Sequence, residues 1–168
     1  METKIGNIIY VSPSEDYKDQ FYDMKEESYA INEDVSIYGL DDENKYKELI
    51  KYPEYIPSSP YWMIDTQRNK IIGALTIRHC LRSSEDKNGH LFLVIRPSER
   101  GKGFGRQAIG FGINKCDELG ITEPLLETYT ENKAAIKALD EAGCILLREY
   151  DENNQARKTY TTRITTKN

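Results

Sequence analysis

The sequence has only three cysteines, one tryptophan and two histidines, no long apolar run and no excess of positive charge. No window approaches the roughly 18 apolar residues of a membrane-spanning helix, and the first residues combine no basic start with an apolar segment. We therefore expect neither membrane insertion nor export, and assign the chain to the cytoplasm. The formal net charge of −5 disfavours nucleic-acid binding, because following a phosphate backbone requires a broad basic surface.

The cysteines Cys80, Cys116 and Cys144 are odd in number, widely spaced and set in apolar surroundings. Buried thiols are therefore expected in preference to disulfides or metal ligands, and no metal is expected. A length of 168 residues is close to the usual size of one domain, so we predict a single domain over residues 1–168.

The most informative segment is an apolar strand, 91–95, that runs into a basic, glycine-rich loop opening a helix. Alternating glycines let the backbone approach a ligand and turn its N–H groups toward one point. The helix N-terminus adds partial positive charge, and three basic side chains add whole charges. The pattern predicts a pyrophosphate site formed by Arg100, Gly101, Lys102, Gly103, Phe104, Gly105 and Arg106.

Two common glycine motifs fit this loop less well. A Walker loop requires Ser or Thr after its Gly-Lys pair, whereas Lys102 is followed by Gly103. The dinucleotide pattern G-x-G-x-x-A is met over 103–108, and Glu123 lies about 20 residues further on. Residues 96–99 separate the strand from the glycines, however, and the upstream strands are predicted to form hairpins without crossover helices. A nucleotide-dependent oxidoreductase therefore rests on the G-x-G-x-x-A match alone and is the least favoured function.

The hydrophobic pattern predicts an alternation of strands and helices. The strand at 90–95 is almost continuously apolar, which is typical of a central strand covered on both faces. In the following helix, Ile109, Ile113, Cys116 and Leu119 form the expected buried stripe. The other expected elements are a strand at 5–11, helices at 15–29 and 41–50, strands at 61–65, 71–81 and 124–130, a helix capped by Asn132, and a hairpin of strands 144–150 and 156–164 joined by a turn at 151–154.

The loop pattern Arg100-x-x-Gly103-x-Gly105, after a strand ending Ile95-x-Pro97, resembles the acetyl-CoA loop of the GNAT N-acetyltransferases. The segment 132–144 is similar to the N-x-x-A-x-x-x-Y-x-x-x-G-F helix of the same family. Residues 62–81, with the Gly-His pair at 89–90, further resemble a bacterial subgroup of largely unassigned substrate. The resemblance covers residues 61–145.

The resemblance implies an α/β fold with a mixed, mostly antiparallel central sheet flanked by helices on both faces. It divides the chain into acceptor-side helices (1–60), an acetyl-CoA-binding core (61–145) and a C-terminal hairpin (146–168). Acetyl-CoA is the implied cosubstrate, attacked directly by an amine in a ternary complex, and a homodimer is possible. The backbone of a splayed strand would polarise the thioester and pair with pantetheine, and a helix start would also contact the pantetheine arm; these residues are Leu93, Val94, Ile95, Asn132 and Ala135.

An attacking amine must lose a proton, so a general base is required. The candidates are Glu127, His90 and Tyr129, of which Glu127 and Tyr129 share one face of a strand by alternation. Structural roles stay open for each, as a strand-end charge for Glu127 and as a hydrogen-bonded loop residue for His90. The family tyrosine that often protonates the leaving thiolate is replaced by Leu139, so Tyr129 or solvent would supply that proton, or catalysis is lost.

We predict an N-acetyltransferase that acts on the primary amine of a small molecule. The alternative, suggested by Leu139, is an acyl-CoA-binding module without turnover. The acceptor pocket is expected to be built by residues 46–60, in which 58–60 form its inner lip, and by residues 82–89. These segments carry no motif that names the acceptor.

Overall fold

The computed structural model describes residues 3–39, 57–81 and 89–162. The expected helix at 41–50 and most of the expected acceptor pocket lie outside these ranges. In chain order the elements are β1 (Thr3–Ile5), β2 (Ile8–Val11), η1 (Glu15–Tyr17), α1 (Lys18–Tyr29), η2 (Ser36–Tyr38), β3 (Ser58–Asp65), β4 (Lys70–Arg78), β5 (Leu91–Ile95), η3 (Pro97–Glu99), α3 (Phe104–Glu118), β6 (Leu126–Tyr129), α4 (Lys133–Glu141), β7 (Ile145–Glu152) and β8 (Gln155–Thr161).

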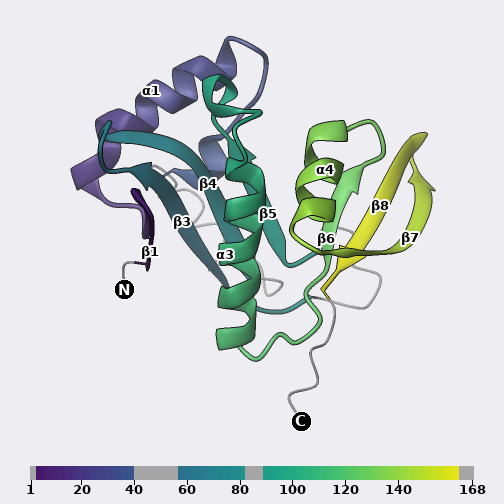
Figure 1. Cartoon of the computed structure of the whole chain (residues 1–168). Helices are drawn as coiled ribbons and strands as arrows, with labels where there is room; N and C mark the ends of the chain where they lie inside the picture. Colours follow the sequence, from purple (N-terminus) through teal and green to yellow (C-terminus); the bar gives the residue numbers. More distant parts are fainter. Residues whose placement is uncertain (1–2, 40–56, 82–88, 163–168) are drawn as a thin grey trace, which may run out of the picture.

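The strands form two antiparallel sheets, a five-stranded sheet in the order β1-β2-β3-β4-β5 and a three-stranded sheet in the order β6-β8-β7 (Figure 1). Helix α1 covers one face of the larger sheet, and α3 covers the opposite face with α4 beside it. The prediction of a mixed α/β fold with helices on both faces is therefore confirmed. Within the described ranges, none of the helices is long and apolar enough to cross a membrane.

Side-chain alternation along the buried strands explains why both faces of the large sheet carry helices. Trp62 points toward α1, where its ring stacks on Phe21 with centroids 4.9 Å apart. Met63, the next residue, points toward α3 and joins the core that contains Phe111. Both residues of β3 are fully buried. A strand that is apolar at consecutive positions thus supplies two cores at once.

Two expected strands differ from the structure at turns. The segment 5–11 forms two strands, because Gly6 adopts a φ of +64° and allows the chain to reverse between β1 and β2. In the C-terminal hairpin, the reversal needs only Asn153 and Asn154, which have φ values of 51° and 62°. Asparagine tolerates this left-handed region, so β7 extends to Glu152, into the expected four-residue turn, and β8 begins at Gln155, directly after it. Residues 58–60, expected as a lip, belong to β3.

The expected buried stripe of α3 is partly wrong. Ile109 and Cys116 are buried as predicted, but Leu119 is exposed because the helix ends at Glu118. Cys80 was expected to be buried and is exposed, whereas Cys144 is half-buried. Cys80 lies beyond the end of β4, which stops at Arg78, so it is not part of the sheet.

Candidate functional site

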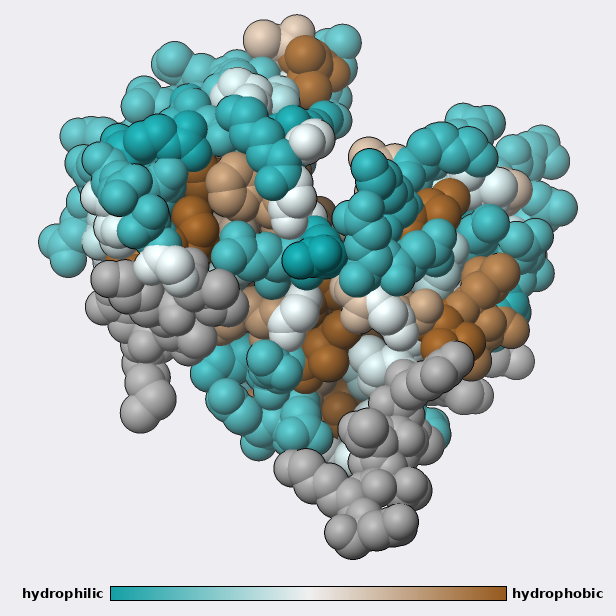
Figure 2. Space-filling model, in the orientation of Figure 1, coloured by the Kyte–Doolittle hydropathy of each residue, from teal (hydrophilic) through white to brown (hydrophobic). Residues whose placement is uncertain are grey.

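A cleft opens between β5 and β6, the facing edge strands of the two sheets. At its closed end the His90 N–H donates to the Leu125 carbonyl at 2.7 Å, and the Leu125 N–H donates to Nδ1 of His90 at 2.9 Å. Gly89 makes this approach possible, because a Cβ there would lie 2.5 Å from the Leu125 carbonyl oxygen. Beyond this point the strands separate around a cavity of about 750 Å³, and Figure 2 shows the molecule hollowed between the two sheets.

The expectation that the strand at 90–95 is central is wrong, whereas its coverage on both faces is confirmed. Among the described strands β5 pairs with β4 alone, and its alternate residues pack against the two cores on either face of the sheet. In the flanking ladder, the Arg78 N–H donates to the His90 carbonyl and the Arg96 N–H donates to the Ile72 carbonyl. Hydrogen-bonded pairs alternate in an antiparallel ladder, so the backbone groups of Leu93 point away from β4 and into the cleft.

The glycine loop is open on the side of the cavity. Gly101 and Gly103 adopt φ values of 75° and 85°, and a Cβ at either position would meet no atom within 4 Å. Gly103 is also the N-cap of α3, so no side chain covers the first N–H groups of this 15-residue helix. The open backbone and the positive end of the helix dipole form a cradle suited to phosphate groups.

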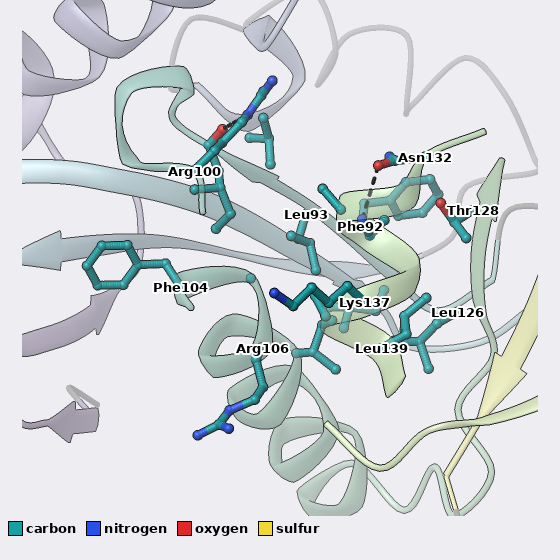
Figure 3. Close-up of a pocket in the computed structure, with 18 of the residues that line it drawn as sticks. Phe92, Leu93, Arg100, Phe104, Arg106, Leu126, Thr128, Asn132, Lys137 and Leu139 are labelled. Carbon is teal, nitrogen blue, oxygen red and sulfur yellow. Dashed lines mark hydrogen bonds between the residues drawn. The ribbon is translucent and has the colours of Figure 1, made fainter. Parts of the chain in front are cut away.

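Two of the three basic side chains of this loop are already neutralised by carboxylates. Both terminal nitrogens of Arg100 contact the Glu33 carboxylate, and its Nε donates to the Ile95 carbonyl at 3.0 Å. Lys102 lies 3.1 Å from Glu99. Arg106 has no such partner among the described residues, and Figure 3 shows that its side chain points in a different direction from that of Arg100. To bind phosphate groups, the loop therefore depends on its backbone N–H groups more, and on its basic side chains less, than the sequence predicts.

Glu99 anchors the loop to the β3–β4 hairpin. Its side chain is 1% exposed and pairs with Arg68 at 2.8 Å, Lys70 at 2.8 Å and Lys102 at 3.1 Å. Hydrogen bonds from Arg68, and then from the two lysines, lower the pKa of Glu99 from 4.5 to about 2 against the opposing effect of burial. The buried carboxylate thus fixes the loop from below while its cations stay at the surface.

The opposite wall of the cavity carries Glu127 and Tyr129, which share one face of β6 as predicted from alternation. The Glu127 side chain is 5% exposed and accepts hydrogen bonds from Thr159 at 2.6 Å and Tyr150 at 3.0 Å. Tyr129 is 44% exposed, and its hydroxyl accepts a hydrogen bond from Arg157 at 3.1 Å. Both residues therefore line the same cavity.

His90 lies at the closed end of the cleft and does not line the cavity. Its side chain is 9% exposed, and Nδ1 is occupied by the Leu125 N–H. The imidazole therefore replaces a backbone acceptor at the point where the two sheets meet. This position suits the structural alternative that the sequence left open for His90.

Helix α4 closes the cavity beside the glycine loop. The Asn132 side chain accepts a hydrogen bond from the Ala135 N–H at 3.1 Å, which confirms the expected N-cap (Figure 3). Both residues line the cavity. Leu139 is 4% exposed and belongs to the core that also holds Leu126, so the position of the family tyrosine is filled by an apolar contact.

Sequence reasoning missed several lining residues. Tyr38 is 7% exposed, its carbonyl accepts a hydrogen bond from Trp62 at 2.7 Å, and burial raises the pKa of its phenol to about 12. Glu33 and Lys137 also line the cavity. Glu33 is distant in sequence from the loop that it contacts, and no motif marks it. Every residue expected at the acetyl-CoA site lines the cavity except Lys102.

Comparisons with known proteins agree with this geometry. The structure is similar to ribosomal-protein-S5-alanine acetyltransferase from Vibrio fischeri, with a TM-score of 0.70, 14% identity and coverage of 99% of this chain and 98% of that one. It is similar to the spermidine N-acetyltransferase SpeG of Vibrio cholerae, with a TM-score of 0.65, 16% identity and coverage of 94% of each chain. RimL, a ribosomal alpha-N-protein acetyltransferase solved with coenzyme A, matches with a TM-score of 0.68, 13% identity and coverage of 98% of each chain.

At these identities the structural matches show a shared fold. No protein of curated function matches the sequence significantly. The model of the acetyltransferase (GNAT) family matches residues 11–144, which include the glycine loop, the cleft and α4. The chain therefore belongs to the GNAT family of acetyltransferases, whose cosubstrate is acetyl-CoA.

Proposed function

We propose that the protein transfers the acetyl group of acetyl-CoA to the primary amine of a small molecule, with Glu127 as the general base. The observation that carries this proposal is that two chemically complementary groups lie on opposite walls of one cavity. The free backbone edge of β5 lies on one side, and the Glu127 carboxylate lies on the other. A donor of hydrogen bonds and an acceptor of protons are the two groups that acyl transfer to an amine requires.

The residues of the cleft fit acetyl-CoA, which supplies an activated acetyl thioester when bound. The open positions at Gly101 and Gly103 leave room for a pyrophosphate against the N-terminus of α3. The free edge of β5 at Leu93 offers N–H and carbonyl groups to an amide-bearing arm. Asn132 and Ala135 border the same space from α4.

The cavity offers an amine one carboxylate beside aromatic rings. Four glutamates and four basic side chains line it; Glu33 and Glu99 are paired with cations of the glycine loop, whereas Glu127 lies on β6 with Tyr129, and Tyr38 adds a second ring. Carboxylates attract an ammonium group, and aromatic faces stabilise a cation near them. Glu127 would then accept the ammonium proton, and the Tyr129 hydroxyl would protonate the departing thiolate in place of the family tyrosine.

Two alternatives remain to be separated from this proposal. The similar structures include enzymes named for protein amines as well as one named for spermidine, so the acceptor could be the N-terminus of a protein. Leu139 supports the second alternative, a module that binds acyl-CoA without turnover. A panel containing small primary amines and short peptides with free N-termini separates the three. Thiol release with small amines supports the proposal, whereas release with peptides alone or with neither contradicts it.

The base is tested by Glu127→Gln, with Glu131→Gln as the matched control because Glu131 is exposed nearby on the same chain segment. Loss of a general base is expected to lower kcat about 10² to 10⁴-fold while acetyl-CoA affinity, measured by calorimetry, stays the same. Glu131→Gln should retain full activity. Equal turnover of Glu127→Gln and the unaltered protein would remove Glu127 as the base.

A further inference from the structure

Three side chains from β7 and β8 form a ring with the Glu127 carboxylate of β6. Thr159 donates to Oε1 at 2.6 Å, and Tyr150 donates to Oε2 at 3.0 Å. Nε of Arg148 donates to the Thr159 hydroxyl at 3.0 Å, and its Nη2 lies 3.9 Å from Oε1. The Arg148 guanidinium also lies over the Tyr150 ring, 5.1 Å from its centroid.

The direction of each hydrogen bond in the ring is fixed by chemistry. A guanidinium only donates, so the Thr159 oxygen must accept from Arg148 and turn its own proton toward Glu127. Burial, and then the hydrogen bond to Glu127, raise the pKa of Tyr150, which keeps the phenol a donor. Both oxygens of the carboxylate are therefore held by neutral donors, and each keeps lone-pair capacity for a proton from the cavity.

A β-bulge brings the ring together. Leu146 lies opposite Tyr160 and Arg148 lies opposite Thr159, so Leu147 is an extra residue in β7. Without it, regular alternation would place Leu147 beside Thr159 and turn Arg148 to the other face. Leu147 is exposed, as are its neighbours Ile145 and Leu146 on this edge strand. The bulge therefore places Arg148 and Tyr150 on the face of the sheet that carries Thr159.

We propose that Thr159, Tyr150 and Arg148 are positioning residues for Glu127, and that they hold its carboxylate in one orientation toward the amine. This inference rests on the proposed function of Glu127 as the base. Thr159 is 1% exposed, so its hydroxyl has no solvent to replace the carboxylate as a partner. A hydrogen bond to a charged group is stronger than one between neutral groups, so losing it releases the carboxylate from this orientation.

Other charged groups near Glu127 are already paired. Arg157, on the same face of β8 as Thr159, contacts the Tyr129 hydroxyl at 3.1 Å and the Glu152 carboxylate at 3.5 Å. From the segment before β5, His90 binds the Leu125 N–H through Nδ1. Arg157 also hydrogen-bonds the Tyr150 side chain, so the effect of the ring on the carboxylate is tested first at Thr159 and then at Tyr150.

The test compares Thr159→Val with Thr159→Ser and with Thr161→Val. Thr161 lies on the same strand, and its buried hydroxyl donates to the Pro124 carbonyl at 2.9 Å instead of to Glu127. Thr159→Val is expected to lower kcat about 10-fold, because the carboxylate is no longer held in place, with unchanged KM for acetyl-CoA. Thr159→Ser should restore kcat, and Thr161→Val should not change it. Equal kcat values for the two valine variants would overturn the inference.

A second variant covers the case in which Thr159→Val does not fold. Tyr150→Phe removes one donor from a half-buried residue, and its kcat should also fall with unchanged KM for acetyl-CoA; an unchanged kcat would contradict the inference. A measurement that does not depend on enzyme activity is the NMR titration of Tyr150. The pKa of Tyr150 should fall in Glu127→Gln, because its hydrogen bond to a carboxylate is lost. An unchanged titration would show that the ring does not form. If Glu127→Gln instead keeps full turnover, the proposed base fails separately from the ring.

Discussion

The buried carboxylate of Glu99 allows a quantitative prediction about the glycine loop. Its pKa is lowered from 4.5 to about 2, which corresponds to about 3 kcal/mol of stabilisation at neutral pH. Arg68 and Lys102 are partly exposed, so solvent screening reduces our expectation to about 2 kcal/mol. Glu99→Gln removes the charge while keeping the shape, and should destabilise the protein by about this amount at pH 7.

The pH dependence follows from the sign of the shift. Because the folded-state pKa is the lower one, the stabilisation is complete above pH 4.5 and is lost as the pH falls toward about 2. Urea unfolding at pH 7 and pH 3.5 should show the difference between Glu99→Gln and the unaltered protein shrinking by about 1 kcal/mol. The control Glu118→Gln breaks an exposed pair with Lys115 and should change stability by less than about 0.5 kcal/mol. A difference that grows toward low pH would refute the reasoning.

Three further predictions concern the cleft. Gly103→Asp places a charged side chain at a position with φ of 85° in the open cradle, and should abolish acetyl-CoA binding in calorimetry while unfolding stays cooperative; retained affinity would exclude the cradle. Arg106→Ala should weaken acetyl-CoA binding about 10-fold, whereas Lys102→Ala, which removes a cation paired in the free protein, should change it less than about 3-fold; the reverse order would contradict the pairing. Gly89→Ala should lower the free energy of unfolding by about 1 to 3 kcal/mol, because its Cβ would lie 2.5 Å from the Leu125 carbonyl oxygen at a φ of 67°; a thermal unfolding curve identical to that of the unaltered protein would refute the contact.

Features that depend on neighbouring residues were predictable from the sequence. The glycine loop, the start of α3 near Phe104 and the Asn132 cap each follow from local backbone preferences, and the structure has all three. The shared face of Glu127 and Tyr129 follows from the period of a strand.

Features that depend on long-range contacts were not predictable. Glu33 lies 67 positions from Arg100, and nothing in either local sequence indicates their contact. The bulge at Leu147 depends on how β7 aligns with β8, which the sequence does not show. The ring around Glu127 could therefore not be predicted, even though Glu127 itself was a candidate. The central position expected for β5 was wrong because an apolar run shows burial but not whether both neighbours are strands.

The arrangement of strand edges has a consequence for aggregation. Unpaired edges invite pairing with other chains, and two sheets have four of them. Here two edges, those of β5 and β6, face each other across the cleft, where a foreign strand would have to enter a space shared with α4 and the glycine loop. Of the outer edges, β1 is three residues long and β7 is interrupted by its bulge. The splay between β5 and β6 therefore gives ligands access to free backbone groups while keeping those groups away from other copies of the chain.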